Sequence, residues 1–430
     1  MNVRLGTRPS VTVGELEAYR RAQLAQTLTF VGRSSPYYAA HLSGKAITPE
    51  TARAHLRRLP VMTGQSWQDS RAAIRTGTPA GAVVGYTSGT TGEPAAFLSS
   101  PTERAELARL QAARRSEGLT LSFTSVNHGS AAFGGFTTGV VPQPLVTEAQ
   151  YEQVALMLER ATEPYASLEP VRGLEGTLFR IKELTLYLME RRGRLDDLGI
   201  KAVTVGRNLL SPAWRRRLED WWGAEVRSVY GFSELRVCNA ASCGVCGYHH
   251  MPPTGLAEIL PLHDDSPVRP GERGRLVVTA FHPYVQLEPR LRYYPGDLAE
   301  LAPEPCIRWG EHGFRPLGRE QHSITLPGSG DLICPADVHP ALADHPDVHR
   351  FHPTPPPTEI FSKDEVGTPR FRLEATEGGA ELHVELRHDP LVWPEKAARA
   401  QQEITDSLLL PHTVDVVVHG PGRLGKVRNI

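Results

Sequence analysis

Apolar residues along the chain follow two alternating patterns, one typical of helices and one typical of strands. In residues 12–70, Leu16, Tyr19, Leu24 and Leu28 recur near helical spacing, which predicts mainly helix. Further helices are predicted at residues 100–118, 211–223 and 394–409. Strands are predicted at residues 82–86, 95–99, 200–206, 274–281, 370–376, 380–386 and 413–420, and residues 225–234 are predicted as a strand that runs into a turn at 231–234. Helices that alternate with short apolar strands favour an α/β sheet with parallel stretches.

The predicted helix at residues 100–118 has clear end signals. Ser100 is the predicted N-cap and Pro101 the first helical residue, because proline has no amide hydrogen to lose there. Gly118 is the predicted stop, since glycine adopts the left-handed conformation that ends many helices. This helix therefore follows directly after the strand at residues 95–99.

The last part of the chain is predicted to fold as a separate small domain. Residues 319–340 resemble a hinge, and residues 349–361 form a proline-rich connection. The strands and the helix that follow predict a small α+β domain over residues 319–430. With 430 residues the chain is too long for one ordinary domain, so two or three domains are expected.

Charge and composition narrow the class of partners. Lys and Arg number 47 against 48 Asp and Glu, so the net charge is −1 and gives no general attraction for nucleic acid or an anionic membrane. No apolar run approaches the roughly 18 residues that span a bilayer. The first residues contain no apolar core of a secretory signal, so a cytoplasmic location is expected.

A loop rich in glycine and hydroxyl residues follows the strand at residues 82–86. It reads Thr-Ser-Gly-Thr-Thr-Gly at residues 87–92, and successive backbone N–H groups of such a loop converge on a phosphate. The loop lacks the Gly-Lys-Ser/Thr of a Walker A motif and the Gly-x-Ser-x-Gly of a nucleophile elbow. Alternatively it is a hairpin turn across which residues 82–86 and 95–99 pair.

Four later motifs indicate that this loop binds the phosphates of a nucleotide. Residues 229–235 place an aromatic residue, a glycine turn, a hydroxyl and a carboxylate close together, at a predicted strand end where α/β sheets bind ligands. Residues 292–301 contain Gly-Asp at 296–297, residues 317–320 read Leu-Gly-Arg-Glu, and Gly-Lys lies at 425–426. Each motif alone is weak, but their joint order is specific.

In this order and spacing the chain resembles the adenylate-forming enzymes, a family of acyl-CoA synthetases, adenylation domains and luciferases, and most of all its phenylacetate–CoA ligase-like branch. The resemblance implies an α/β fold with a large multi-layer N-terminal adenylation domain, residues 1–318, and a small mobile α+β C-terminal lid domain, residues 319–430. It implies ATP- and Mg²⁺-dependent activation of a carboxylic acid to an acyl-adenylate with release of pyrophosphate. The acid is expected to be an aryl or a small amino or hydroxy acid, and coenzyme A or a phosphopantetheine carrier protein the acceptor. The oligomeric state is open, a homodimer included.

The resemblance assigns roles to individual residues. Tyr230 and Gly231 match the adenine-stacking aromatic and its neighbour, Ser233 the hydroxyl on the α-phosphate and Glu234 the Mg²⁺ carboxylate. Asp297 and Arg319 match the ribose contacts, and Lys426 matches the lysine that the small domain delivers for adenylation. The implied phosphate loop is Thr87, Ser88, Gly89, Thr90, Thr91 and Gly92.

The chain also departs from the family pattern. Glu93 stands where the loop usually has lysine, and Glu320-Gln321-His322 replaces the acidic pair after the Gly-Arg motif. These changes keep open a second hypothesis, a non-catalytic nucleotide-binding member that acts as a scaffold or partner.

Residues 128–139 lie where the family places part of its acyl pocket. His128, Phe133, Gly134 and Phe136 would line a slot for a flat or short acid. The alternative is a structural glycine-rich turn with two core phenylalanines.

Clustered cysteines point to a metal. Cys238, Cys243, Cys246 and His249 form a Cys-x4-Cys-x2-Cys-x2-His pattern, whose spacing is typical of zinc knuckles. Some members of the resembled branch have a cysteine just before the Gly-Arg motif, where this chain has Cys306. Four of these five residues are expected to bind a structural zinc ion that connects the loop after Glu234 to residues 301–318.

Overall fold

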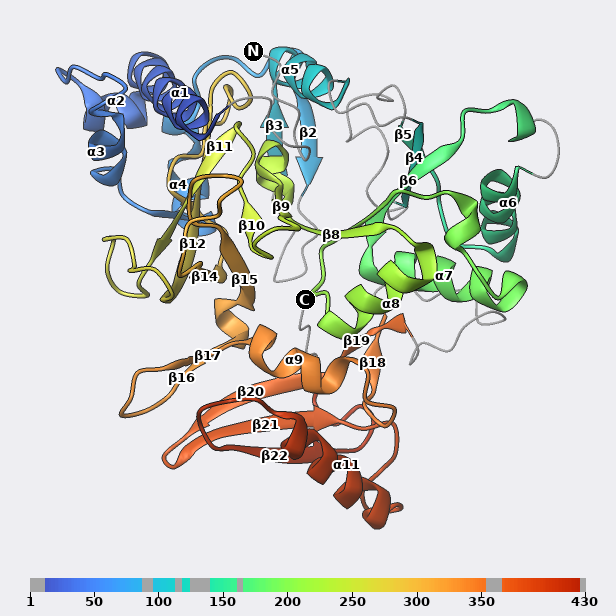
Figure 1. Cartoon of the computed structure of the whole chain (residues 1–430). Helices are drawn as coiled ribbons and strands as arrows, with labels where there is room; N and C mark the ends of the chain where they lie inside the picture. Colours follow the sequence, from blue (N-terminus) through green and yellow to red (C-terminus); the bar gives the residue numbers. More distant parts are fainter. Residues whose placement is uncertain are drawn as a thin grey trace. The chain divides into compact units, whose positions relative to one another are not determined.

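The structure is a computed structural model of the whole chain, which describes residues 12–86, 96–112, 118–123, 140–160, 165–352 and 366–425 (Figure 1). Contacts within the chain divide it into two compact units. The first is built from described residues of 12–112 and 228–316, and the second from those of 118–123, 140–227 and 317–425. No helix in the described ranges is both long enough and apolar enough to cross a membrane.

Helices at the start of the first unit cover a largely antiparallel sheet. The helices are α1 (Val13–Ser34), α2 (Pro36–Leu42), α3 (Ala52–Arg57), α4 (Gly64–Ile74) and α5 (Pro101–Ala112). The strands of the sheet in this unit are β1 (Met62–Thr63), β8 (Glu225–Tyr230, entering this unit at Ser228), β9 (Ala240–Ser242), β10 (His249–His250), β11 (Gly255–Leu260), β12 (Arg273–Ala280), β13 (Tyr293–Tyr294), β14 (Asp297–Leu301) and β15 (Phe314–Arg319, leaving it after Pro316). Strands β2 (Val83–Tyr86) and β3 (Ala96–Ser99) form a separate two-stranded sheet. Neighbours in the sheet run β1-β13-β12-β14-β15-β10-β9-β8, with β11 beside β12, and one apolar core joins α1 and α2 to β11 and β12.

The first part of the second unit is a parallel α/β layer. Its strands are β4 (Leu119–Phe123), β5 (Val140–Pro142), β6 (Val171–Thr177) and β7 (Ala202–Gly206), in the order β7-β6-β4-β5 and all parallel. Its helices are α6 (Glu148–Glu159), α7 (Leu178–Arg192) and α8 (Pro212–Trp222). Buried residues of all three helices and of β6 and β7 form one core (Figure 1). The parallel stretches predicted from the alternating pattern are confirmed.

The second part of the second unit has a core of its own. It contains β16 (Ile324–Thr325), β17 (Leu332–Ile333), α9 (Pro335–Ala343), β18 (Arg350–Phe351), β19 (Thr368–Pro369), β20 (Phe371–Thr376), β21 (Gly379–Glu385), α11 (Pro394–Ser407) and β22 (Val414–His419). Strands β20 and β21 pair antiparallel and β21 and β22 pair parallel, as expected when a helix, α11, connects them. The core of this part draws only on residues between 324 and 418.

Helix ends agree closely with the local signals. The Glu103 amide donates to the Ser100 hydroxyl at 3.1 Å, so Ser100 caps α5 as predicted. Helix α8 begins at Pro212 after the N-cap Ser211 and ends at Gly223, which has a φ of 58°. The prediction for residues 225–234, a strand that runs into a turn at 231–234, is confirmed, because β8 ends at Tyr230 and a 3₁₀ turn begins at Ser233.

Candidate functional site

The strands on both sides of the predicted phosphate loop pair with each other. Strands β2 and β3 are antiparallel, with Tyr86 opposite Ala96, so the predicted pairing of these two strands is confirmed. A Cβ on Gly85 would lie 2.3 Å from the ring of Phe97, so only glycine fits there. The loop itself, Thr87, Ser88, Gly89, Thr90, Thr91 and Gly92, and Glu93 lie outside the described residues.

Two buried carboxylates hold the base of this hairpin. Glu288 is fully buried; it accepts the Leu98 amide at 2.9 Å and pairs with Arg71 at 2.7 Å and Arg75 at 3.2 Å. Glu103 accepts the amide of Leu287 at 2.8 Å. Charge-assisted hydrogen bonds such as those of Glu288 with arginine and a backbone N–H are the stronger kind. Strand β3, which follows the predicted loop, is therefore tied to the segment that precedes β13.

Two of the predicted nucleotide residues lie together. The Tyr230 hydroxyl donates to Oδ2 of Asp297 at 2.7 Å, and both side chains are half-buried. Tyr230 also packs edge-on against Phe314, with the ring centres 5.7 Å apart. The position after Tyr230 requires glycine, because a Cβ on Gly231 would lie 2.1 Å from Oδ1 of Asn239. Gly296 has a φ of 91°, which glycine adopts readily in the turn before Asp297.

The predicted magnesium carboxylate lies beside a buried cation. Glu234 is half-buried in the 3₁₀ turn that Ser233 begins, and it accepts the Tyr293 hydroxyl at 3.3 Å. Arg290 donates to the Glu234 carbonyl at 3.5 Å and lies over the Trp67 ring at 3.9 Å. Burial lowers the pKa of Arg290, an effect that the nearby Tyr293 and Glu234 oppose. The sequence alone did not single out Arg290 or Tyr293, because their role depends on packing between distant segments.

The remaining nucleotide residue that the structure describes is in the second unit. Arg319 is the last residue of β15 and is half-buried. Gly318 before it has a φ of 107°, and a Cβ there would lie 2.9 Å from Pro335, so the Gly-Arg turn requires glycine. Lys426 and the predicted acyl-pocket residues His128, Phe133, Gly134 and Phe136 lie outside the described residues.

Three cysteines and a histidine converge in the first unit. Cys243, Cys246, His250 and Cys306 each offer one ligand atom, and these atoms all lie within 4.8 Å of one another. The Cys243 and Cys306 sulfurs are 3.9 Å apart, and Nε2 of His250 is 3.2 Å from the Cys246 sulfur. Three sulfurs and one imidazole nitrogen are the donors of a closed structural zinc site.

The surroundings of this cluster suit a metal. The Val245 amide donates to the Cys243 sulfur at 3.4 Å, and Gly247 turns the chain with a φ of 76°. Burial raises the pKa of the Cys243 thiol, but backbone N–H groups of Cys246 and Val245 and the neighbouring thiols offset this, so the net shift is downward. Burial raises the pKa of Cys246 to about 12.

A second layer orients the histidine. His250 is 2% exposed and stacks on Trp309 with ring centres 5.0 Å apart. Its Nδ1 lies 3.8 Å from Oε1 of Glu311, which also pairs with the buried Arg20. A carboxylate behind the ring favours a hydrogen on Nδ1, which leaves the Nε2 lone pair directed at the cysteines. At 3.8 Å the two atoms are too far apart for a hydrogen bond, so the carboxylate acts on the ring through its charge.

Two residues of the predicted ligand set do not reach this cluster. His249 lies in β10 immediately before His250, and successive side chains of a strand point to opposite faces, so Nε2 of His249 lies 3.3 Å from the Ser228 hydroxyl instead. Cys238 is 1% exposed in the apolar core, and burial raises the pKa of its thiol. The geometry corrects the candidate set to Cys243, Cys246, Cys306 and His250, and the sequence pattern had missed His250 because spacing does not fix the face of a strand.

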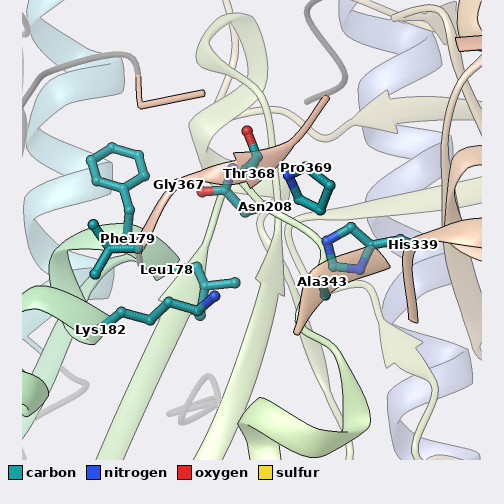
Figure 2. A pocket seen from close by; sticks show the side chains of 10 residues that line it. Leu178, Phe179, Lys182, Asn208, His339, Ala343, Gly367, Thr368 and Pro369 are labelled. Carbon is teal, nitrogen blue, oxygen red and sulfur yellow. The ribbon is translucent and has the colours of Figure 1, made fainter. Parts of the chain in front are cut away.

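The second unit contains a small pocket of its own, lined by apolar and polar residues. Figure 2 shows the polar side chains of Lys182, Asn208 and His339 beside apolar ones such as Leu178 and Phe179. Lys182 lies over the Trp214 ring at 4.2 Å, and burial lowers its pKa to about 7. Burial, with the charges of Lys182 and Arg350, lowers the pKa of His339 to about 3, so this ring is neutral at neutral pH.

The fold is that of the acyl-CoA ligases that form adenylates. The chain is similar to 2-hydroxyisobutyryl-CoA ligase in its postadenylation state with R3-HIB-AMP, with a TM-score of 0.62, 14% identity, and coverage of 96% of this chain and 86% of that one. For an open conformation of the same ligase with 2-HIB-AMP and CoA, the TM-score is 0.61 and the identity 15%, with coverage of 96% of this chain and 88% of that one. For the o-succinylbenzoate CoA synthetase of Bacillus subtilis with its acyl-adenylate OSB-AMP, the TM-score is 0.52 and the identity 17%, with coverage of 80% of this chain and 69% of that one. The sequence matches no family sequence model and no curated protein.

Proposed function

We propose that this protein activates a carboxylic acid with ATP, forming an acyl-adenylate and pyrophosphate, and then transfers the acyl group to a thiol. The observation that carries the proposal is the hydrogen bond from Tyr230 to Asp297, with Glu234 on the turn that follows Tyr230. An aromatic ring beside a carboxylate suits adenine stacking and ribose binding. Two solved structures of similar fold contain acyl-adenylates.

The chemistry requires two anions to meet, because a carboxylate attacks the α-phosphate. Glu234 would hold Mg²⁺, and its half-buried carboxylate beside a tyrosine hydroxyl fits a hard cation with oxygen ligands. The bound ion would neutralise charge on the phosphates. The loop at 87–92 would add backbone N–H groups, and Ser233 would donate to the α-phosphate, so that donors surround the pentavalent phosphorus.

The second half-reaction needs a thiol acceptor, for which we propose coenzyme A. One similar ligase binds its acyl-adenylate together with CoA. A phosphopantetheine carrier protein offers the same thiol, so a comparison of the two acceptors belongs to the test. The acid is proposed to be an aryl or a small amino or hydroxy acid. Its pocket would be lined by His128, Phe133, Gly134 and Phe136.

We further propose that residues 319–430 act as the lid domain. Their separate core between residues 324 and 418 supports a distinct domain, and contacts within the chain group this domain with residues 140–227. Arg319 begins this domain and would contact the ribose, while Lys426 would be delivered to the reacting phosphate by rotation of the domain. A flexible stem with a compact charge suits a residue that arrives with a moving domain.

Zinc is proposed as a structural ion at Cys243, Cys246, His250 and Cys306. The closed set of four donors leaves no position for a substrate, which distinguishes a structural site from a catalytic one. The ion would connect the β9–β10 turn to the segment between β14 and β15. It would therefore stiffen the region between Glu234 and Arg319.

The test is ATP–pyrophosphate exchange by the full chain with a panel of carboxylic acids. We expect exchange with at least one acid, its loss in Lys426→Ala, and retained exchange in the matched variant Lys396→Ala, which changes an exposed lysine of the same domain. ATP binding without exchange for any acid would contradict the catalytic proposal and favour the non-catalytic alternative. Thioester formation is then measured with CoA and with a carrier protein.

A further inference from the structure

The outer face of the C-terminal sheet carries a cluster of ionisable side chains. Strands β20, β21 and β22 turn alternate residues inward, where Leu373, Leu382 and Val384 are buried. The outward positions of β20 and β21 include Glu374, Glu381 and His383, and that of β22 includes His419. This cluster lies in the second unit and shares no residue with the cysteine cluster of the first.

Two carboxylates of the same charge face each other across this sheet. Glu374 of β20 is the direct cross-strand partner of Glu381 of β21. Like charges directly opposite destabilise a strand pair, so this arrangement calls for a cation between them. Arg372 satisfies one oxygen of Glu374, Oε1, at 2.7 Å, which leaves Oε2 directed toward His383.

A buried histidine nitrogen lies close to both carboxylates. Nε2 of His383 is 3.2 Å from Oε2 of Glu374 and 3.1 Å from Oε2 of Glu381. His383 is only 8% exposed, yet its Nε2 makes no hydrogen bond with any of the described residues. Both carboxylates are more than one third exposed, at 44% and 37%, so the position between the three groups is open to an ion from solvent.

The hydrogen bond of Nδ1, the other ring nitrogen, determines whether Nε2 carries a hydrogen or a lone pair. Nδ1 of His383 lies 2.9 Å from Nε2 of His419, a distance at which one nitrogen must donate to the other. When His383 Nδ1 donates, Nε2 carries a bare lone pair. Three ligand atoms, one from each residue, then lie within 4.8 Å of one another, which fits a ligand set. His419 then orients the ring from behind, as outer partners of metal-binding histidines do.

We propose that His383, Glu374 and Glu381 bind one Zn²⁺ ion, with His419 as the residue that positions the His383 ring. The donors are the imidazole and carboxylate groups that zinc binds. In a tetrahedral site with zinc–ligand bonds of ~2.0–2.1 Å, neighbouring ligand atoms lie ~3.3 Å apart, close to the 3.1 and 3.2 Å measured here. A water molecule completes the site, because both carboxylates reach solvent. The ion would cross-link β20 and β21.

The test is a calorimetric titration of the full, chelator-stripped chain with zinc chloride, comparing wild type with His383→Gln. Zinc bound by the cysteine cluster contributes equally to both proteins, so the difference reports only the site on the sheet. We expect the wild type to bind one more ion per chain than His383→Gln. Equal stoichiometry and affinity in the two proteins would overturn the proposal.

A second variant separates metal binding from misfolding. Glu381→Gln removes an exposed carboxylate and its repulsion with Glu374, so the metal-free variant should unfold at no lower temperature than wild type. Its zinc affinity at this site should fall by roughly tenfold or more. His388→Gln is the matched control, because His388 pairs with Asp347 at 3.0 Å in the same domain and should leave zinc binding unchanged. Unchanged zinc affinity in Glu381→Gln would also overturn the proposal, and none of these readouts depends on acid activation.

Discussion

The Tyr230 hydroxyl donates a hydrogen bond of 2.7 Å to Oδ2 of Asp297, although the two residues are 67 positions apart in the chain. Tyr230 ends β8, and Asp297 begins β14 directly after the glycine turn at Gly296. The bond holds an aromatic face next to a fixed carboxylate before any ligand arrives. Such preorganisation lowers the cost of ordering a nucleotide on binding.

Asp297→Ala is expected to weaken ATP binding by about tenfold or more, because charge-assisted hydrogen bonds of about 1.5–3 kcal/mol are lost. Tyr230→Phe keeps the ring for stacking and should weaken binding less. Calorimetric titration with ATP measures both effects. Tyr248→Phe is the control, since its hydroxyl also donates to a carboxylate, that of Glu300 at 3.4 Å. Equal ATP affinity in Asp297→Ala and wild type would refute the ribose role.

Cys246→Ser is expected to lower the zinc content by about one ion per chain and to lower the unfolding temperature, because a structural zinc ion contributes its binding free energy to folding. Metal analysis and thermal unfolding measure the two effects. Cys238→Ala should keep its zinc, since Cys238 is buried in the apolar core away from the cluster. A zinc content that depends on Cys238 or His249 would contradict the corrected ligand set.

Lys182 should make stability depend on pH. Burial lowers its folded-state pKa from 10.5 to about 7, so between these values the unfolded chain binds a proton that the folded chain does not. The contribution of Lys182 to the free energy of unfolding therefore rises with pH, by at most about 1.4 kcal/mol per pH unit, from about pH 7 to about pH 10. Below pH 7 the full penalty for the buried charge is present.

Urea unfolding of wild type and Lys182→Met at pH 6.5 and 8.5 checks this dependence. The difference between the two proteins should change by up to about 2 kcal/mol, with the wild type gaining relative stability at the higher pH. Lys396→Met is the control, because Lys396 lies over Trp393 at 5.2 Å but at an exposed position. A parallel pH profile for wild type and Lys182→Met would rule out a low pKa for Lys182.

Glu288→Ala is expected to lower the free energy of unfolding by on the order of 3 kcal/mol, because it leaves Arg71 and the Leu98 amide without their buried partner. It should also raise the Michaelis constant for ATP, since Glu288 holds the hairpin that carries the predicted phosphate loop. Urea unfolding and initial-rate kinetics measure these effects. Glu272→Ala removes an exposed partner of Arg269 and should change neither. Wild-type stability in Glu288→Ala would show that the hairpin has other anchors.

The local sequence predicted the elements well where end signals and apolar spacing agreed. Ser100 caps α5 and Gly223 ends α8, because capping depends on residues within one turn. The order of motifs also predicted the fold that the similar solved structures share. Most of the predicted strands lie within two residues of an observed strand, and the strand predicted to run into a turn at 231–234 ends at Tyr230, before the 3₁₀ turn that begins at Ser233.

Tertiary structure alone decided which side chains meet. The sequence placed His249 at zinc-knuckle spacing, but strand alternation in β10 directs His250 to the cysteines, and one residue of register reverses the face of every side chain. Arg290 beside Glu234, and His383 between Glu374 and Glu381, have no sequence signal, because their partners come from other segments. The sequence by itself determined the elements, the motif order and the fold class, which are set by local propensity and periodicity. The ligand sets and the buried charges were decided by packing between segments far apart in the chain.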